Sequence, residues 1–151
     1  MTGAVGSVYE DDLDAVYGYL VYRHGSRRLA EDWTQATFER AASGGGDVRR
    51  DPRGSRIALL ALARDVSATA PVAPGDDGTM APDLAAGLSA LDRGERTVLA
   101  LRFGARLRPG EIAGMLDLTD RRVRQLLSRG LRRVRTELER ESRGNGQQDQ
   151  A

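Results

Sequence analysis

The chain of 151 residues contains no cysteine and a single histidine, His24. The absence of cysteine excludes disulfides, cysteine-based zinc sites and thiol catalysis, and one histidine excludes a metal site built on a histidine pair. No apolar run approaches the roughly 20 residues that are needed to span a bilayer. The N-terminal residues also lack the basic and apolar blocks of a signal peptide, so we expect a cytoplasmic protein. We also expect no metal and no other cofactor.

Lysine is missing as well, so all 23 basic residues are arginine. The formal net charge is only +1, but the charges are unevenly distributed. Residues 1–84 hold 9 arginines and 13 acidic residues, whereas residues 85–151 hold 14 arginines and 9 acidic residues. A split of this kind suggests that the basic half contacts a polyanion and that the acidic half does not.

The apolar spacing predicts helices and no strands. The expected helices cover residues 11–24, 26–42, 56–68, 84–91, 93–103, 109–116 and 119–140. Residues 69–83 contain three prolines and two glycines, which is typical of a linker. The predicted fold class is therefore all-α, with two small helical domains at 9–68 and 84–141 and a disordered tail at 142–151.

A helix-turn-helix is predicted in the basic half, within RPGEIAGMLDLTDRRVRQLLSRGLRRV. Asp117 suits the tight turn because aspartate tolerates the left-handed conformation, and Thr119 suits the N-cap of the second helix. An apolar seam is expected along that helix, formed by Val123, Leu127, Leu131, Val134 and Leu138.

The other face of this second helix is polar. It carries Arg121, Arg122, Arg124, Gln125, Ser128, Arg129 and Arg132. In a helix-turn-helix the first turns of the second helix enter the major groove of DNA, where arginine and glutamine can bond to base edges. No glycine-rich phosphate loop, carboxylate pair or nucleophile–base set accompanies this face, so we expect DNA binding and no enzymatic activity.

The acidic half contains a polar stripe in LAEDWTQATFERA, residues 29–41. Asp32, Gln35 and Glu39 are spaced by three and four residues and so lie on one side of the predicted helix. We expect Trp33 and Phe38 to face the core and His24, at a helix end, to lie at the surface.

Three stretches of the sequence resemble the bacterial RNA polymerase sigma factors of the sigma-70 family, in the extracytoplasmic-function (ECF) group. LAEDWTQATFERA resembles that family's polymerase-binding helix, and RIALLALARD, at 56–65, is similar to the helix that follows it. Residues 90–138, which contain the predicted helix-turn-helix, resemble the domain that binds the promoter −35 element. The resemblance covers most of residues 10–140 in the family's order.

The resemblance implies a sigma factor whose partners are core RNA polymerase, promoter DNA and an anti-sigma protein. Asp32 and Gln35 match family positions that contact polymerase, and Glu39 is added from helix geometry alone. The family's recognition helix corresponds to Arg121, Arg122, Arg124, Gln125, Ser128 and Arg129. The two domains would then correspond to sigma region 2, at 9–68, and sigma region 4, at 84–141.

The sequence departs from the family where the −10 element is read and melted. The family usually has tryptophan at the position of Ala58 and asparagine at that of Asp65, and residues 43–70 contain no aromatic side chain. Single-stranded DNA binding uses aromatic platforms together with positive charge. The remaining candidates for contacts with the −10 strand are Arg49, Arg50, Arg53 and Arg56.

Two other functions are compatible with the sequence. One is a stand-alone helix-turn-helix regulator whose N-terminal half serves dimerisation or ligand sensing. The other is a sigma-like protein that binds polymerase but does not melt promoters, which the departures in residues 43–70 suggest.

Overall fold

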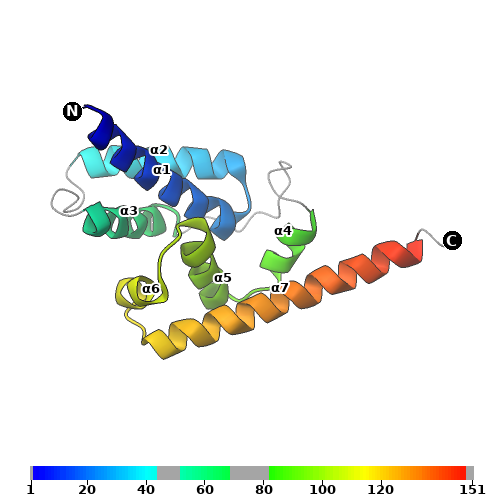
Figure 1. Ribbon diagram of the computed structural model, residues 1–151. Coiled ribbons are helices and arrows are strands. Elements are labelled where there is room, and N and C mark those ends of the chain that lie inside the picture. The colour runs from blue at the N-terminus through cyan, green and yellow to red at the C-terminus, as the bar shows by residue number, and fades with distance from the viewer. Residues whose placement is uncertain (1, 44–51, 69–81, 149–151) are drawn as a thin grey trace.

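The computed structural model describes residues 2–43, 52–68 and 82–148, and the regular elements in these ranges are all helices (Figure 1). This result confirms the predicted all-α fold class. The elements are α1 (Thr2–His24), α2 (Arg27–Ala42), α3 (Pro52–Val66), α4 (Pro82–Ser89), α5 (Arg93–Leu99), the π-helical turn η1 (Ala100–Gly104), α6 (Pro109–Leu116) and α7 (Asp120–Gln148).

Helices α1, α2 and α3 pack against one another and form an N-terminal unit. The chain turns between α1 and α2 at Gly25, whose φ of 73° is readily adopted by glycine. Ser26 then caps α2, because its Oγ accepts a hydrogen bond from the Leu29 amide at 3.2 Å. The predicted helix at residues 26–42 is thereby confirmed, with Ser26 as its cap.

The C-terminal unit consists of α4, α5, η1 and α6 arranged along the long helix α7 (Figure 1). Helix α5 begins with a capping box. Asp92 Oδ1 accepts a hydrogen bond from the Glu95 amide at 2.8 Å, and the Asp92 amide donates to Glu95 Oε1 at 3.1 Å. The prediction of one continuous helix at 93–103 is wrong at its C-terminal end, because the α-helix α5 ends at Leu99 and the π-helical turn η1 begins at Ala100.

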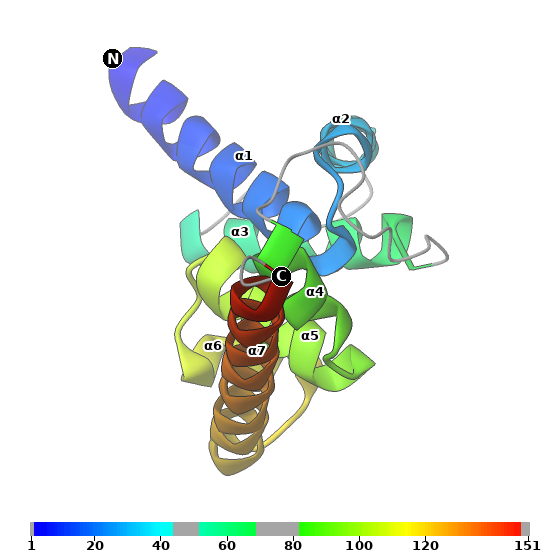
Figure 2. The ribbon, with the colours of Figure 1, turned by 90° about the vertical axis from the view of Figure 1, so that its right-hand side faces the viewer.

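The main hydrophobic core lies between the two units. Val16 and Leu20 of α1 and Leu60 of α3 are fully buried in one cluster with Leu101 of η1 and Leu107. Figure 2 shows α1 and α3 lying directly over the segment that contains η1 and α6. The two units therefore pack as one body, although most of the predicted linker, residues 69–81, lies outside the described residues.

Two glycines face each other where α1 crosses η1. A Cβ atom on Gly18 of α1 would overlap the carbonyl oxygen of Gly104, and a Cβ on Gly104 would overlap the carbonyl oxygen of Gly18. Only glycine lets the two backbones approach this closely. The pair thus determines how near α1 can come to η1.

Four helices extend beyond their predicted limits. One of them, α4, begins at Pro82 instead of residue 84. Helix α1 begins at Thr2 instead of residue 11, and α3 begins at Pro52 instead of residue 56, with proline in the first turn, where it needs no hydrogen-bond donor. Helix α7 continues to Gln148 instead of ending at Arg140. The chain is thus helical as far as Gln148, where a disordered tail was predicted from residue 142.

The prediction that His24 lies at the surface is wrong. His24 is only 2% exposed, and its ring packs on that of Trp33 with centroids 4.8 Å apart. Helix α2 covers the last turn of α1, which the sequence pattern of α1 alone does not indicate. Trp33 and Phe38 pack against the core as expected, although both are only partly buried.

Candidate nucleic-acid interface

Helices α6 and α7 form the predicted helix-turn-helix. Helix α6 ends at Asp117, which adopts the left-handed conformation with φ 55° and ψ 47°. Thr119 then caps α7, because its Oγ1 accepts a hydrogen bond from the Arg122 amide at 3.1 Å. Both local predictions, the turn at Asp117 and the cap at Thr119, are confirmed.

One face of α7 is anchored in the C-terminal unit. Val123 and Leu126 are buried, and a Cβ on Gly130 would lie 2.8 Å from Leu99 Cδ1 of α5, so α5 and α7 are in close contact there. The predicted seam is correct at Val123 and in part at Leu127 and Val134, which are partly buried. It is wrong at Leu131 and Leu138, which are 48% and 36% exposed. In this part of α7 the buried face instead contains Leu126 and Gly130, because the short helix α5 packs there and does not extend along the rest of α7.

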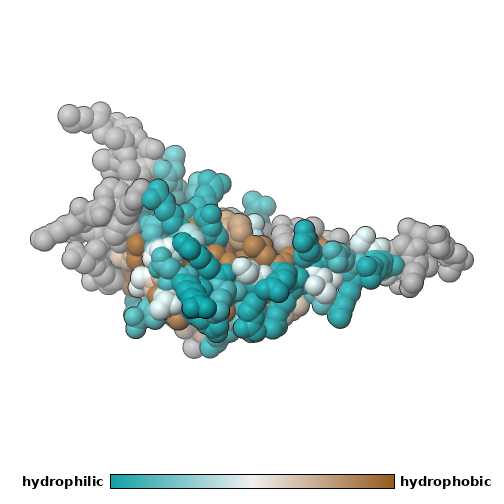
Figure 3. Space-filling view, turned by 60° about the horizontal axis from the view of Figure 1, so that its bottom comes forward, coloured by the Kyte–Doolittle hydropathy of each residue, from teal (hydrophilic) through white to brown (hydrophobic). Residues whose placement is uncertain are grey.

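The predicted recognition residues lie together on the opposite, exposed face of α7. They line an open groove of about 860 Å³, whose lining residues are Asp120, Arg121, Arg122, Arg124, Gln125, Ser128, Arg129 and Arg132. Figure 3 shows hydrophilic residues gathered along this side of the molecule. With five arginines and a single carboxylate, the groove has the charge that attracts a phosphate backbone.

Within this groove, Arg122 and Gln125 contact each other. Arg122 Nη1 donates a hydrogen bond to Gln125 Oε1 at 3.4 Å, which places the two side chains next to each other one turn apart. The glutamine amide nitrogen and the exposed guanidinium of Arg124 can then reach base edges. The first two turns of α7 thus combine groups that can bond to bases with groups that can bond to phosphates.

Arg129 has a second role that the sequence does not indicate. Its Nε lies 3.9 Å from Glu95 Oε2, and Arg133 Nε lies 3.4 Å from Glu95 Oε1. Glu95 is completely buried at the start of α5, where it also completes the capping box. Arg129 therefore lies at the edge of the groove and links α7 to α5.

The three predicted polymerase-binding residues, Asp32, Gln35 and Glu39, are all exposed on α2. Gln35 Nε2 donates a hydrogen bond to Glu39 Oε1 at 3.0 Å. Gln35 and Glu39 also line a groove of about 720 Å³ between α1 and α2, together with the apolar side chains of Leu13, Tyr17 and Phe38. Asp32 is not among the residues that line this groove.

The four arginines predicted for −10 contacts are not brought together by the described structure. Arg49 and Arg50 lie outside the described residues, and the side chain of Arg53 is not described. Arg56 is placed on α3, where its Nε lies 3.1 Å from Oδ1 of the buried Asp12. Arg56 thus ties α3 to α1.

Helix α2 and the first turns of α7, which line the arginine groove, lie on opposite sides of the molecule (Figures 1 and 2). Between them lie α1, α3, α5 and the shared core. The fold therefore presents two separate surfaces, one around the polar stripe of α2 and one lined with arginine.

The described residues contain neither a metal-binding cluster nor a membrane-spanning helix. Within the described ranges, no three histidine or acidic side chains gather in a way that could hold a metal ion. None of the helices in the same ranges is both long and apolar enough to cross a membrane.

Comparison with known proteins identifies the C-terminal part of the chain. No curated protein and no solved structure matches the sequence. Residues 87–136 match the family model of sigma-70, region 4, and this segment extends from the end of α4 through the helix-turn-helix into α7. The match covers about a third of the chain and shows that this segment is similar to region 4 of sigma-70, a DNA-binding regulatory domain.

Proposed function

We propose that this chain is an ECF-type sigma factor, which binds core RNA polymerase through α2 and the −35 element of promoter DNA through α7. The observation that carries the proposal is the arginine-lined groove, which is formed by the predicted recognition residues and lies within the segment that matches sigma-70 region 4. The resemblance of α2 to the polymerase-binding helix of the family supports the first half of the proposal.

In this mechanism the first turns of α7 enter the major groove. Arg124 and Gln125 bond to base edges, and the outer arginines of the groove neutralise phosphates. The α2 surface on the opposite side holds polymerase, so the chain joins the enzyme to its promoter. No covalent step falls to the chain itself, and the partners are cytoplasmic: polymerase, promoter DNA and an anti-sigma protein.

A second candidate function is a sigma-like protein that binds polymerase without melting promoters. Two observations favour it over an ECF-type sigma factor that melts promoters. Residues 43–70 lack aromatic side chains for single-stranded DNA, and Arg56 is engaged with Asp12. Melting of the −10 element is therefore the step at which the two functions differ.

Run-off transcription with purified core polymerase tests these alternatives. An ECF-type sigma factor gives a specific transcript from a duplex promoter, whereas the non-melting protein gives one only when the template carries a pre-opened bubble at −10. Failure to bind core polymerase in a pull-down would exclude both and leave the stand-alone regulator.

A further inference from the structure

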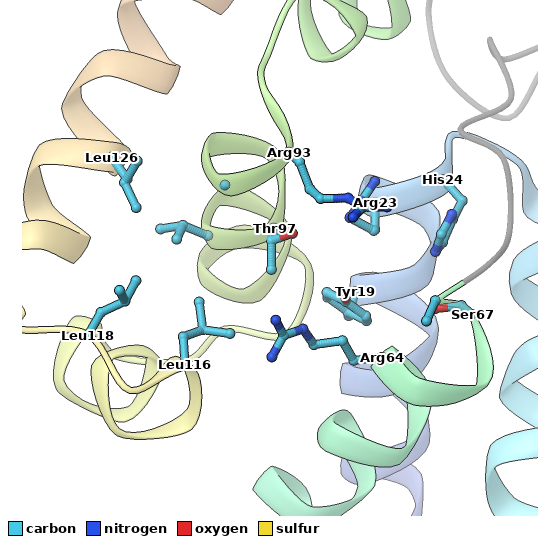
Figure 4. Close-up of a pocket in the computed structure, with 13 residues that line it drawn as sticks. Tyr19, Arg23, His24, Arg64, Ser67, Arg93, Thr97, Leu116, Leu118 and Leu126 are labelled. Carbon is cyan, nitrogen blue, oxygen red and sulfur yellow. The ribbon is translucent and has the colours of Figure 1, made fainter.

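A cavity of about 410 Å³ lies between the two units, away from the α7 groove and the α2 surface (Figure 4). Tyr19 and Arg23 of α1 and Arg64 of α3 line it from the N-terminal unit. The C-terminal unit contributes Arg93 of α5 and apolar side chains that include Leu116, Leu118 and Leu126. Its size is in the range of small-molecule sites, which is roughly 300–1,000 Å³.

Three guanidinium groups from three different helices meet at this cavity. Arg23 is buried, whereas Arg64 and Arg93 are exposed at its edge. Figure 4 shows the guanidinium of Arg93 beside that of Arg23, with Arg64 directed into the same space. Among the described residues, no acidic side chain lines the cavity and none of the three arginines forms an ion pair.

This arrangement is electrostatically costly without a counter-charge. Burial lowers the pKa of Arg23, Arg93 and Arg64 lower it further, and only the Tyr19 interaction raises it. Burial and, to a smaller extent, the charge of Arg23 also lower the pKa of Arg96 to about 10. Buried charges in proteins are normally paired, so an anion would supply what these groups lack.

We propose that this cavity is a binding site for a small molecule that carries two or more phosphate groups. The phosphates lie among Arg23, Arg64 and Arg93, which offer the planar, multiple donors that suit phosphate oxygens. The uncharged part of the molecule lies against Leu116, Leu118 and Leu126 on the opposite wall. The proposal does not depend on the transcriptional role, since it rests on the cavity alone.

Because both units line the cavity, ligand binding is coupled to their packing. A molecule that bonds to Arg23 and Arg64 on one side and to Arg93 on the other binds only while the units are packed. Binding to that state alone stabilises it by mass action, in proportion to the logarithm of ligand concentration over Kd. The ligand would therefore hold the two units together.

The test is titration calorimetry of the full chain with three probes: adenosine diphosphate, inorganic pyrophosphate and adenosine. We expect adenosine diphosphate to bind more tightly than pyrophosphate, because it also covers the leucine wall, and adenosine not to bind. Arg64→Gln and Arg93→Gln should each weaken binding of the diphosphate by about tenfold or more, since each removes a charged hydrogen bond. Arg40→Gln, at an exposed position of α2 outside the cavity, should leave binding unchanged.

Gly104→Ala provides a second, independent variant. It keeps all three arginines but introduces a Cβ that overlaps the Gly18 carbonyl, so it should separate the units and weaken binding of the diphosphate as well. Absence of binding by both phosphate probes at millimolar concentration would overturn the proposal. It would also be overturned if Arg121→Gln abolished binding while Arg64→Gln did not, because the anion would then lie in the α7 groove.

Discussion

At the scale of single residues, Glu95 has several functions at once. Its carboxylate is completely buried, accepts a hydrogen bond from the Asp92 amide, and lies near the guanidinium groups of Arg129 and Arg133. The two arginines are about half exposed, at 47% and 46%, so water screens part of the interaction. Glu95 therefore joins the start of α5 to the middle of α7 through one side chain.

Glu95→Gln tests this role. Glutamine keeps an oxygen that can cap α5 but removes the charge that pairs with Arg129 and Arg133. We expect the free energy of unfolding to fall by about 1–2 kcal/mol, measured by urea denaturation. Glu139→Gln, at an exposed position of α7, is the control and should change the free energy of unfolding by less than about 0.5 kcal/mol. Equal effects of the two substitutions would show that the Glu95 pairs contribute nothing.

Arg124 and Gln125 are the residues on which we expect base recognition to depend. Arg124→Ala or Gln125→Ala should relax base preference within the −35 element, at a cost of roughly 1–3 kcal/mol per lost bidentate contact. Binding to a panel of single-base variants of the target duplex measures this preference. Arg135→Ala, on α7 but outside the groove, serves as the control. A uniform loss of affinity across the panel would indicate phosphate contacts instead.

Tyr19 makes stability sensitive to alkaline pH. Burial raises its pKa above 10.0, and the charges of Arg23 and Arg64 oppose this only in part. A raised pKa in the folded state means that the stabilisation is complete below pH 10 and is lost as the pH rises through the folded pKa. The free energy of unfolding should therefore fall as the pH rises above about 10, and by more in the wild type than in Tyr19→Phe. Parallel curves for the two proteins would refute this role.

At the scale of helices, the helix-turn-helix was the most predictable part of the fold. Pro109, Asp117 and Thr119 each act on the backbone within a few residues, so their effects can be read from the local sequence. The exposed position of Leu131 could not be predicted in this way, because it depends on where α5 ends against α7. The same reason explains His24, which α2 covers, and Arg129, whose contact with Glu95 joins two helices.

Helix α2 carries the expected contact with polymerase. Asp32→Ala combined with Gln35→Ala changes two exposed side chains and should leave the fold intact, while it weakens binding to core polymerase about tenfold or more, as expected for the loss of charged hydrogen bonds. Co-purification with core polymerase and circular dichroism measure the two effects. Arg40→Ala, at an exposed position of α2 outside the α1–α2 groove, is the control. Undiminished co-purification of the double variant would remove this role from α2.

At the scale of the whole molecule, packing of the two units could not be predicted from the sequence. Gly18 and Gly104 are separated by 86 positions, and neither is distinguished from the other glycines of the chain by its neighbours in the sequence. Their importance follows only from the crossing of α1 over η1. The recognition residues, in contrast, share one helix face and were predicted together.

Gly104→Ala should separate the units without unfolding them. The added methyl group overlaps the Gly18 carbonyl, so α1 and η1 must move apart. We expect a larger radius of gyration in small-angle X-ray scattering, with helical circular dichroism retained. Gly114→Ala, whose Cβ would meet no atom within 4 Å, is the matched control and should raise stability by about 0.5–1 kcal/mol through helix propensity. An unchanged radius for Gly104→Ala would contradict the assigned role of the crossing.

The shared core also affects the energetics of every encounter that the chain makes. Leu20 and Leu60 on one unit and Leu101 and Leu107 on the other are buried in the hydrophobic cluster that the two units share. In any complex in which the units separate, these four leucines become exposed to water. Full exposure costs about 1.5–3 kcal/mol of free energy for each side chain, unless another surface covers it. A partner that binds the core-facing surface of one unit must therefore displace the other unit from it. In this sense each unit inhibits the binding of partners to the apolar surface of the other.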